Sequence, residues 1–155
     1  MLATFLTVVA LASSANAVVP QWQTDYAKAY SLAATKHRPL AVFLAEGTKP
    51  EMTAANTKLL NDSYVVVFVD TNSDAGKKLA ASFDMAKGLV ISDSVADKQA
   101  LRLTGTVAES DLTTALVRFA DPTLVVTTTA TTPAPVVVAP MMRPSCATGN
   151  CPFAR

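Results

Sequence analysis

Residues 38–51 read RPLAVFLAEGTKPE and contain the signals for a strand, a turn and a helix start in succession. The apolar run at 40–45 has the length and composition of a strand that is covered on both faces of a sheet. The pair Arg38-Pro39 ends any helix before it, because a residue that precedes proline avoids the right-handed helical conformation. Glu46-Gly47 is typical of a turn, and residues 48–51 match a capping box with proline in the first helical turn. We therefore predict a buried strand that leads directly into a helix.

A helix is predicted on each side of this strand. Upstream, Thr24 or Asp25 is suited to cap a helix that runs to about Lys36, with apolar residues at three- and four-residue spacing. Trp22 precedes this helix and is expected to staple its start to the core. Downstream, the helix that starts near Thr48 is expected to end at residues 61–63 and to bury four apolar side chains. These are Met52, Ala55, Leu59 and Leu60.

The remaining elements follow in a regular order. Residues 64–70, YVVVFVD, form the strongest strand pattern in the chain, and Ser73 or Asp74 can cap a short helix after it. Strands at 88–92 and 99–103 are joined by a short turn, and a last helix runs from about 109 to 120. The first two strands are joined by a helix and are therefore expected to be parallel, whereas the last two form a hairpin. We predict an α/β domain with a mixed four-stranded central sheet and helices on both faces.

Charge and composition exclude some classes of partner. The chain has 155 residues and a formal net charge of +1, and only Arg143 and Arg155 are charged beyond residue 122. Residues 18–122 carry 11 basic and 12 acidic side chains without a cluster of Lys and Arg. Nucleic-acid binding and polybasic membrane binding both need such a cluster. We therefore expect neither activity.

The first seventeen residues, MLATFLTVVALASSANA, match an export signal. An apolar stretch at 2–12 is followed by the A-x-A cleavage pattern Ala15-Asn16-Ala17, and the stretch is too short to anchor the chain in a bilayer. The absence of Lys and Arg before the apolar stretch departs from the usual pattern and leaves open a buried N-terminal strand or helix. We expect a secreted or periplasmic protein that begins near Val18 and has no membrane anchor.

Residues 123–155 have the composition of a linker rather than a domain. Thr-rich sequence at 127–132 leads into three prolines by residue 140, and this composition is typical of an extended, disordered tail. Its valines leave open the addition of a strand to a sheet edge. The two cysteines, Cys146 and Cys151, are expected to form a local disulfide in an oxidising compartment. A redox pair, a link between chains and metal binding stay open, although two thiolates leave a zinc site two ligands short.

Three stretches of the domain resemble the thioredoxin superfamily. WQTDYAKAYSLAATKHRPLAVFLAEG at 22–47 is similar to the opening helix and first core strand of exported thioredoxin-like proteins. SYVVVFVDTNSDAGKKLAASFDM at 63–85 resembles their second core strand and the helix after it. GLVISDSVADKQALRLTGTVAESDLTTALVRFA at 88–120 resembles their closing hairpin and last helix. The resemblance implies a thioredoxin-like domain over residues 18–122.

The resemblance also implies where a redox site would lie. The family has a Cys-x-x-Cys turn after the first core strand, where a helix N-terminus lowers the pKa of the first thiol. The corresponding turn here contains no cysteine. Its residues are Glu46, Gly47, Thr48, Lys49 and Pro50.

The second redox feature of the family is a cis-proline opposite that turn. The aligned position in this chain is Lys87, within Met85-Ala86-Lys87-Gly88, and no proline stands there. The resemblance therefore implies the fold without the redox chemistry, and we expect no catalytic residue, cofactor or metal site. Asp70 to Asp74 match the first half of a calcium loop, but Ala75 and Ala81 replace its required glycine and glutamate. A helix cap explains the same residues.

These observations favour a non-catalytic module that binds another exported protein or peptide. In the family, the groove around residues 46–50 and 86–88 holds extended peptides. Two alternatives stay open. One is a divergent thiol-disulfide oxidoreductase that uses the tail cysteines, and the other is a cell-surface or matrix component that they cross-link. The oligomeric state is open as well.

Overall fold

The structure is a computed structural model that describes residues 19–121, 123–124, 126–127, 132–133 and 135. The expectations for the export signal at 1–17 and for Cys146 and Cys151 lie outside the described residues, as does most of the predicted tail. Within the described residues, no helix is both long enough and apolar enough to cross a bilayer.

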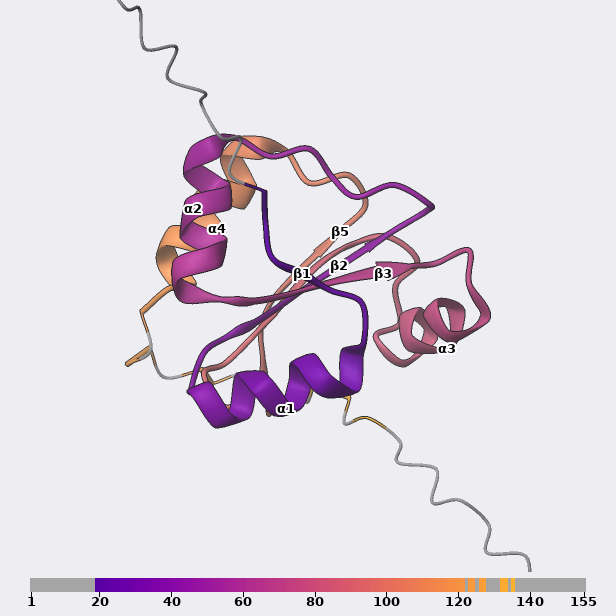
Figure 1. The fold of residues 1–155 in the computed structure, drawn as a ribbon, viewed down its shortest axis with the longest axis horizontal. Coiled ribbons are helices and arrows are strands. Elements are labelled where there is room, and N and C mark those ends of the chain that lie inside the picture. The colour runs from indigo at the N-terminus through magenta and orange to yellow at the C-terminus, as the bar shows by residue number, and fades with distance from the viewer. Residues whose placement is uncertain (1–18, 122, 125, 128–131, 134, 136–155) are drawn as a thin grey trace, which may run out of the picture.

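Nine elements follow one another along the described chain, and their arrangement is drawn in Figure 1. In chain order they are β1 (Trp22–Gln23), α1 (Tyr26–Lys36), β2 (Leu40–Ala45), α2 (Ala54–Ser63), β3 (Val65–Asp70), α3 (Asp74–Ser82), β4 (Gly88–Ser92), β5 (Gln99–Thr104) and α4 (Glu109–Phe119). The strands form one mixed sheet in the order β1-β3-β2-β4-β5. β1, β3 and β2 are parallel, and β4 is antiparallel to both of its neighbours.

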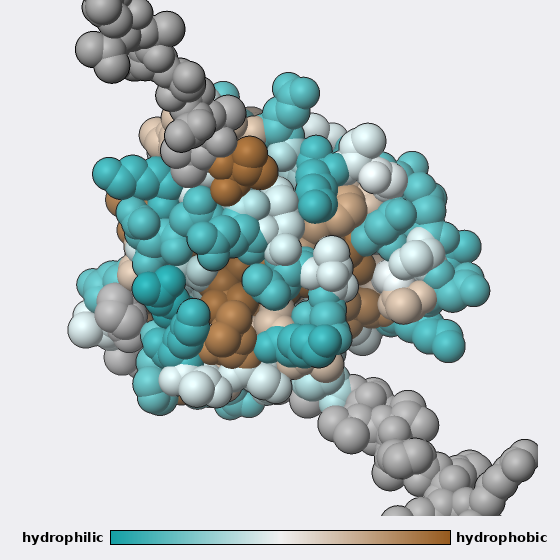
Figure 2. Space-filling model, in the orientation of Figure 1, coloured by the Kyte–Doolittle hydropathy of each residue, from teal (hydrophilic) through white to brown (hydrophobic). Residues whose placement is uncertain are grey.

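The sheet has a separate hydrophobic core on each face. α1 and α3 cover one face, and α2 and α4 cover the other (Figure 1). Alternate residues of β2 point to opposite sides, so that Val42 joins the first core and Phe43 the second. The predicted burial of this strand on both faces is therefore confirmed. Figure 2 shows that the surface in this view is largely hydrophilic, with hydrophobic residues in small areas.

The predicted sheet of four strands is wrong by one strand. β1 is the fifth, and it pairs with the edge of β3 through Trp22↔Val66 and Gln23↔Val67. A strand of two residues is too short to show the alternation that identifies longer strands. Trp22 packs against the core as predicted, and the core that it contacts lies on the face opposite α1. Its ring makes edge contacts with Phe43 at 5.3 Å and Phe68 at 6.0 Å, on the α2 and α4 face.

The predicted start of the second helix is also wrong. α2 begins at Ala54, with Thr53 as its N-cap, and the Thr53 side chain accepts a hydrogen bond from the N–H of Asn56. A helix capped by Thr48 requires Lys49 in the right-handed helical conformation, which a residue before proline avoids. Residues 46–53 therefore form a loop.

The later start also changes which side chains of α2 are buried. Asn56 and Thr57 are buried together with Leu60. Ala55, which we expected inside, is exposed, whereas Met52 and Leu59 are half-buried.

The end of α1 provides a test of the fold at an exposed position. His37 adopts a left-handed conformation, with φ at 51°, and its N–H donates back to the last turn of the helix. Glycine occupies this conformation without the penalty that a Cβ brings. We expect His37→Gly to stabilise the domain by about 1 kcal/mol and to raise Tm by roughly 4–8 °C. Thermal unfolding, followed by circular dichroism, measures the Tm of the variant and of the wild type.

His37→Ala is the matched control, because it removes the imidazole and keeps the Cβ. We expect no increase in Tm for that variant. Equal increases in the two variants would contradict the assignment of strain to the backbone of His37.

Candidate functional site

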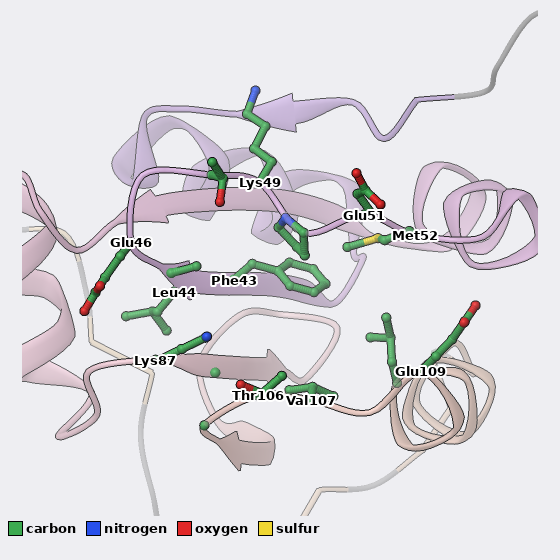
Figure 3. Close-up of a pocket in the computed structure, with 16 residues that line it drawn as sticks. Phe43, Leu44, Glu46, Lys49, Glu51, Met52, Lys87, Thr106, Val107 and Glu109 are labelled. Atoms are coloured by element: carbon green, nitrogen blue, oxygen red, sulfur yellow. The ribbon is translucent and has the colours of Figure 1, made fainter.

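A cleft of the domain lies at the end of the sheet where β2 finishes and β4 starts. Its volume is about 780 Å³, and three chain segments line it: the loop 46–52, Lys87-Gly88 and residues 105–107 before α4 (Figure 3). Four of the five residues predicted for the turn line the cleft, namely Glu46, Thr48, Lys49 and Pro50. The structure therefore brings these four residues and Lys87 together as parts of the lining of one cleft.

Strand pairing explains why these distant segments meet. In the antiparallel register of β2 and β4, Leu44 lies opposite Gly88, so that the end of one strand adjoins the start of the other. The hairpin of β4 and β5 brings the third segment, and the N–H of Gly105 donates to the carbonyl of Lys87 over 2.8 Å. Residues 105–107 are thus part of the site, although our sequence analysis did not include them.

The cleft has an apolar floor and a charged rim. Phe43, Met52, Val107 and Leu112 contribute apolar side chains, and Figure 3 shows Phe43, Met52 and Val107 around one space. The charged lining residues are Glu46, Lys49, Glu51, Lys87 and Glu109.

The two lysines of the rim are placed differently. The ammonium group of Lys49 lies 6.0 Å from the centroid of the Trp22 ring, and in Figure 3 its side chain extends away from Lys87. The lining residues thus carry three carboxylates and two ammonium groups, and Lys49 is directed away from Lys87. Such a rim favours a ligand that carries a positive charge next to an apolar segment.

The carboxylate of Asp70 holds the loop 46–53 against the end of β3. One oxygen of this carboxylate accepts hydrogen bonds from the N–H groups of Asn72 and Gly47, each over 2.9 Å. Gly47 has φ at +70°, a conformation that suits glycine. The bond from Asn72, and then the bond from Gly47, hold the pKa of the Asp70 carboxyl below its usual value.

The residues considered for a calcium loop act instead as a turn and a helix cap. The Ser73 hydroxyl donates to the carbonyl of Asp70 over 2.8 Å and accepts from the N–H of Gly76 at the start of α3. Across the described part of the chain, no group of three or more His, Cys, Asp or Glu side chains is placed to hold a metal ion.

The lowered pKa of Asp70 predicts a pH dependence for this loop. A carboxyl whose pKa is lower in the folded state stabilises that state above its unfolded pKa, and the effect is lost as pH falls through the folded value. In Asp70→Asn the side-chain oxygen still accepts hydrogen bonds but carries no charge. We expect the variant to have a lower Tm than wild type near pH 7 and the same Tm near pH 2. A difference in Tm that stays constant across this range would contradict the role of the charge.

The start of β4 has little space beside its backbone. Gly88 has φ at +142°, and a Cβ at this position would lie 2.0 Å from the carbonyl oxygen of Leu103. The described residues contain no cis peptide bond, so that Lys87 occupies the predicted position with a trans bond. The close contact between β4 and β5 fixes Lys87 at the edge of the cleft.

Comparison by sequence finds no counterpart for this chain. No protein-family model matches it, and no curated protein is similar to it at a significant level. Comparison by structure does find counterparts. The solution structure of a thioredoxin from Thermus thermophilus matches with a TM-score of 0.53 and 19% identity, over 64% of this chain and 85% of that chain. The chain has a thioredoxin-like fold.

A second solved structure agrees with this assignment. The DsbH oxidoreductase matches the thioredoxin-like chain with a TM-score of 0.51 and 17% identity, over 76% of this chain and 93% of that one. At such low identity the likeness shows the fold alone, and the chemistry has to be argued from the residues of the cleft. In the thioredoxin-like turn of this chain, residues 46–51 contain no cysteine.

Proposed function

We propose that this protein is a non-catalytic thioredoxin-fold module that holds an extended peptide of an exported partner in the cleft. The observation that carries the proposal is the cleft itself. The loop 46–52, Lys87 and residues 105–107 enclose an apolar floor, while the turn that would need a thiol contains none. Contact, rather than bond exchange, is the chemistry that these side chains support.

The backbone of the cleft supports recognition of an extended chain. Within the described residues, Ala86 and Thr106 take no part in the backbone hydrogen bonds that join neighbouring loops. Unpaired N–H and carbonyl groups beside an apolar floor are what an added strand uses, because backbone pairing supplies affinity and side-chain contacts supply specificity. Both residues are exposed, next to Lys87 and Val107 of the cleft.

Selection from a random peptide library displayed on phage tests this proposal. We expect the purified protein to enrich extended apolar peptides, and Thr106→Trp to weaken their binding at least tenfold by filling the cleft. Thr114→Trp is the matched control, because Thr114 is exposed on α4 and does not line the cleft. Equal binding to the two variants would place the peptides elsewhere and would overturn the proposal.

The oxidoreductase alternative has its own test. We expect the protein not to accelerate the reduction of insulin by dithiothreitol, because the turn at 46–51 has no thiolate to attack a disulfide. Acceleration that disappears in Cys146→Ser or Cys151→Ser would replace the binding module with a redox enzyme that uses the tail.

Export is part of the proposal and rests on residues 1–17. The expected mature protein begins at Val18 and accumulates outside the cytoplasm. N-terminal sequencing of the protein from the exported fraction checks the cleavage site. A chain that still begins at Met1 in the cytoplasm would remove the exported partner from the proposal.

A further inference from the structure

The chain that follows α4 contacts the other face of the sheet, which α1 and α3 cover. The N–H of Thr132 donates to the carbonyl of Asp97 over 2.8 Å, and the Tyr26 hydroxyl donates to the carbonyl of Pro133 over 2.5 Å. Thr132 is only 1% exposed. Burial, with a smaller effect of Tyr30, raises the pKa of Tyr26, so that its hydroxyl remains a donor. These contacts anchor the chain on the face that α1 and α3 cover.

The two anchoring contacts are made to residues of two different segments. Asp97 lies in the turn after β4, at the end of the sheet opposite the cleft. Tyr26 begins α1 directly after β1, at the end where the parallel strands finish and where the cleft lies. Thr132 and Pro133 thus lie where the turn of Asp97 and the hydroxyl end of the Tyr26 side chain come together. Figure 1 shows the last described residues near the start of α1.

A second groove adjoins the cleft. It has a volume of about 470 Å³ and runs along the end of α3, where Ala81, Met85 and Ala86 line it. We call it the α3 groove. The Tyr26 ring meets the ring of Phe83, which follows α3, edge-on at 6.1 Å. At its other end the α3 groove shares Glu46 with the cleft. The α3 groove and the cleft are thus adjacent, and the anchor contacts the end of α3 through Tyr26 and Phe83.

We propose that residues 136–143 of the same chain, VVVAPMMR, pass along the α3 groove and occupy the cleft. This inference rests on the proposed function, since it names the peptide that the cleft holds. Eight extended residues span roughly 26 Å. The way around the end of the sheet, from one helical layer to the other, is about 20 Å, or two helix diameters. The segment is therefore long enough to place its last residues in the cleft.

The chemistry of this segment matches the cleft. Its valines and methionines are apolar like the floor of Phe43, Met52 and Val107, and methionine adapts to irregular apolar surfaces. Pro140 restricts the backbone and lowers the entropy lost on binding. Arg143 is the one charged residue between Asp121 and Arg155, and the rim of the cleft carries an excess of carboxylates.

A spin label on the natural cysteine next to this segment tests the inference. In the Cys151→Ser protein a nitroxide on Cys146 lies three residues beyond Arg143. We expect it to broaden the amide signals of residues 46–52 and 105–107 more than those of α1 at Thr35. We expect this selective broadening of the amide signals to stay unchanged when the protein is diluted tenfold. Val137→Asp together with Met141→Asp is the control, and we expect it to abolish the selective broadening.

Other outcomes overturn the inference. Broadening spread evenly over the domain means that the segment does not occupy the cleft. Broadening transferred from a spin-labelled, unenriched chain to a ¹⁵N-enriched chain without the label means that a second copy supplies the peptide in trans.

Peptide affinity separates this inference from the proposed function. A tethered segment competes at an effective concentration of about 1 mM, which for a segment Kd of about 0.1 mM weakens peptide binding roughly tenfold, so we expect the Val137→Asp/Met141→Asp protein to bind the selected peptides roughly tenfold more tightly than wild type. Equal affinity, together with the weakening in Thr106→Trp, would overturn the inference and retain the proposed function. Loss of the Thr106→Trp effect would overturn the proposed function itself.

Discussion

Replacing Gly88 with alanine is expected to destabilise the domain by about 4 kcal/mol or more, a large part of the usual 5–15 kcal/mol of a small domain. The added Cβ would lie 2.0 Å from the carbonyl oxygen of Leu103 and 2.6 Å from the terminal carbon of Met85. The backbone conformation adds a cost of about 1–3 kcal/mol, because φ at +142° is one that L side chains rarely adopt. To relieve the contact, β4 and β5 must separate where Gly88 pairs with Thr104.

Urea unfolding, followed by circular dichroism, measures the effect of Gly88→Ala. Gly105→Ala is the matched control, because Gly105 also has a positive φ, +85°, but nothing lies within 4 Å of its added Cβ. We expect this control to lose only about 1 kcal/mol, the cost of the backbone conformation alone. Similar losses at the two positions would show that the contact of β4 with β5 is looser than the structure has it.

Gly76→Ala is expected to destabilise the domain by about 3 kcal/mol, although this change in a helix normally stabilises it by about 1 kcal/mol. A Cβ on Gly76 would lie 1.9 Å from the carbonyl oxygen of Asp70 and 2.8 Å from the Ser73 hydroxyl oxygen. α3 must then move away from the end of β3 and lose its cap. The missing side chain is therefore what allows α3 to start so close to the loop of Asp70.

The unfolding midpoint in urea again provides the measurement for Gly76→Ala. Ala75→Gly is the control at the neighbouring exposed position, where we expect the ordinary helix propensity to cost about 1 kcal/mol. A gain of stability in Gly76→Ala would mean that α3 tolerates the Cβ and that its packing on β3 differs from that described.

Much of the fold could be predicted because the central strands are continuous apolar runs with clear boundaries. β2 occupies Leu40–Ala45 as predicted, and Ser73 caps α3 as one of the two predicted candidates. The start of α2 differs from the prediction because Pro50 keeps Lys49 out of the helical conformation that the capping-box pattern at 48–51 requires. β1 was missed because its two residues gain their pairing only from the edge of β3.

The candidate site could be predicted in part. The resemblance indicated the turn at 46–50 and Lys87, and the register of β2 with β4 brings them together. Residues 105–107 have no local signal beyond Gly105, since their position depends on the pairing of β5 with β4. The burial of Thr132 was likewise beyond the sequence, because a Thr- and Pro-rich composition says nothing of a contact with Asp97 that lies 35 residues earlier.

A photo-crosslink from the edge of the cleft tests the central claim most directly. With benzoylphenylalanine in place of Lys87, irradiation followed by mass spectrometry identifies the chain that lies in the cleft. We predict a crosslink to one extended peptide segment, and none from the same group at Lys58, which is exposed on α2. Equal crosslinking from both positions, or no peptide crosslink from position 87, would contradict a cleft that acts by contact.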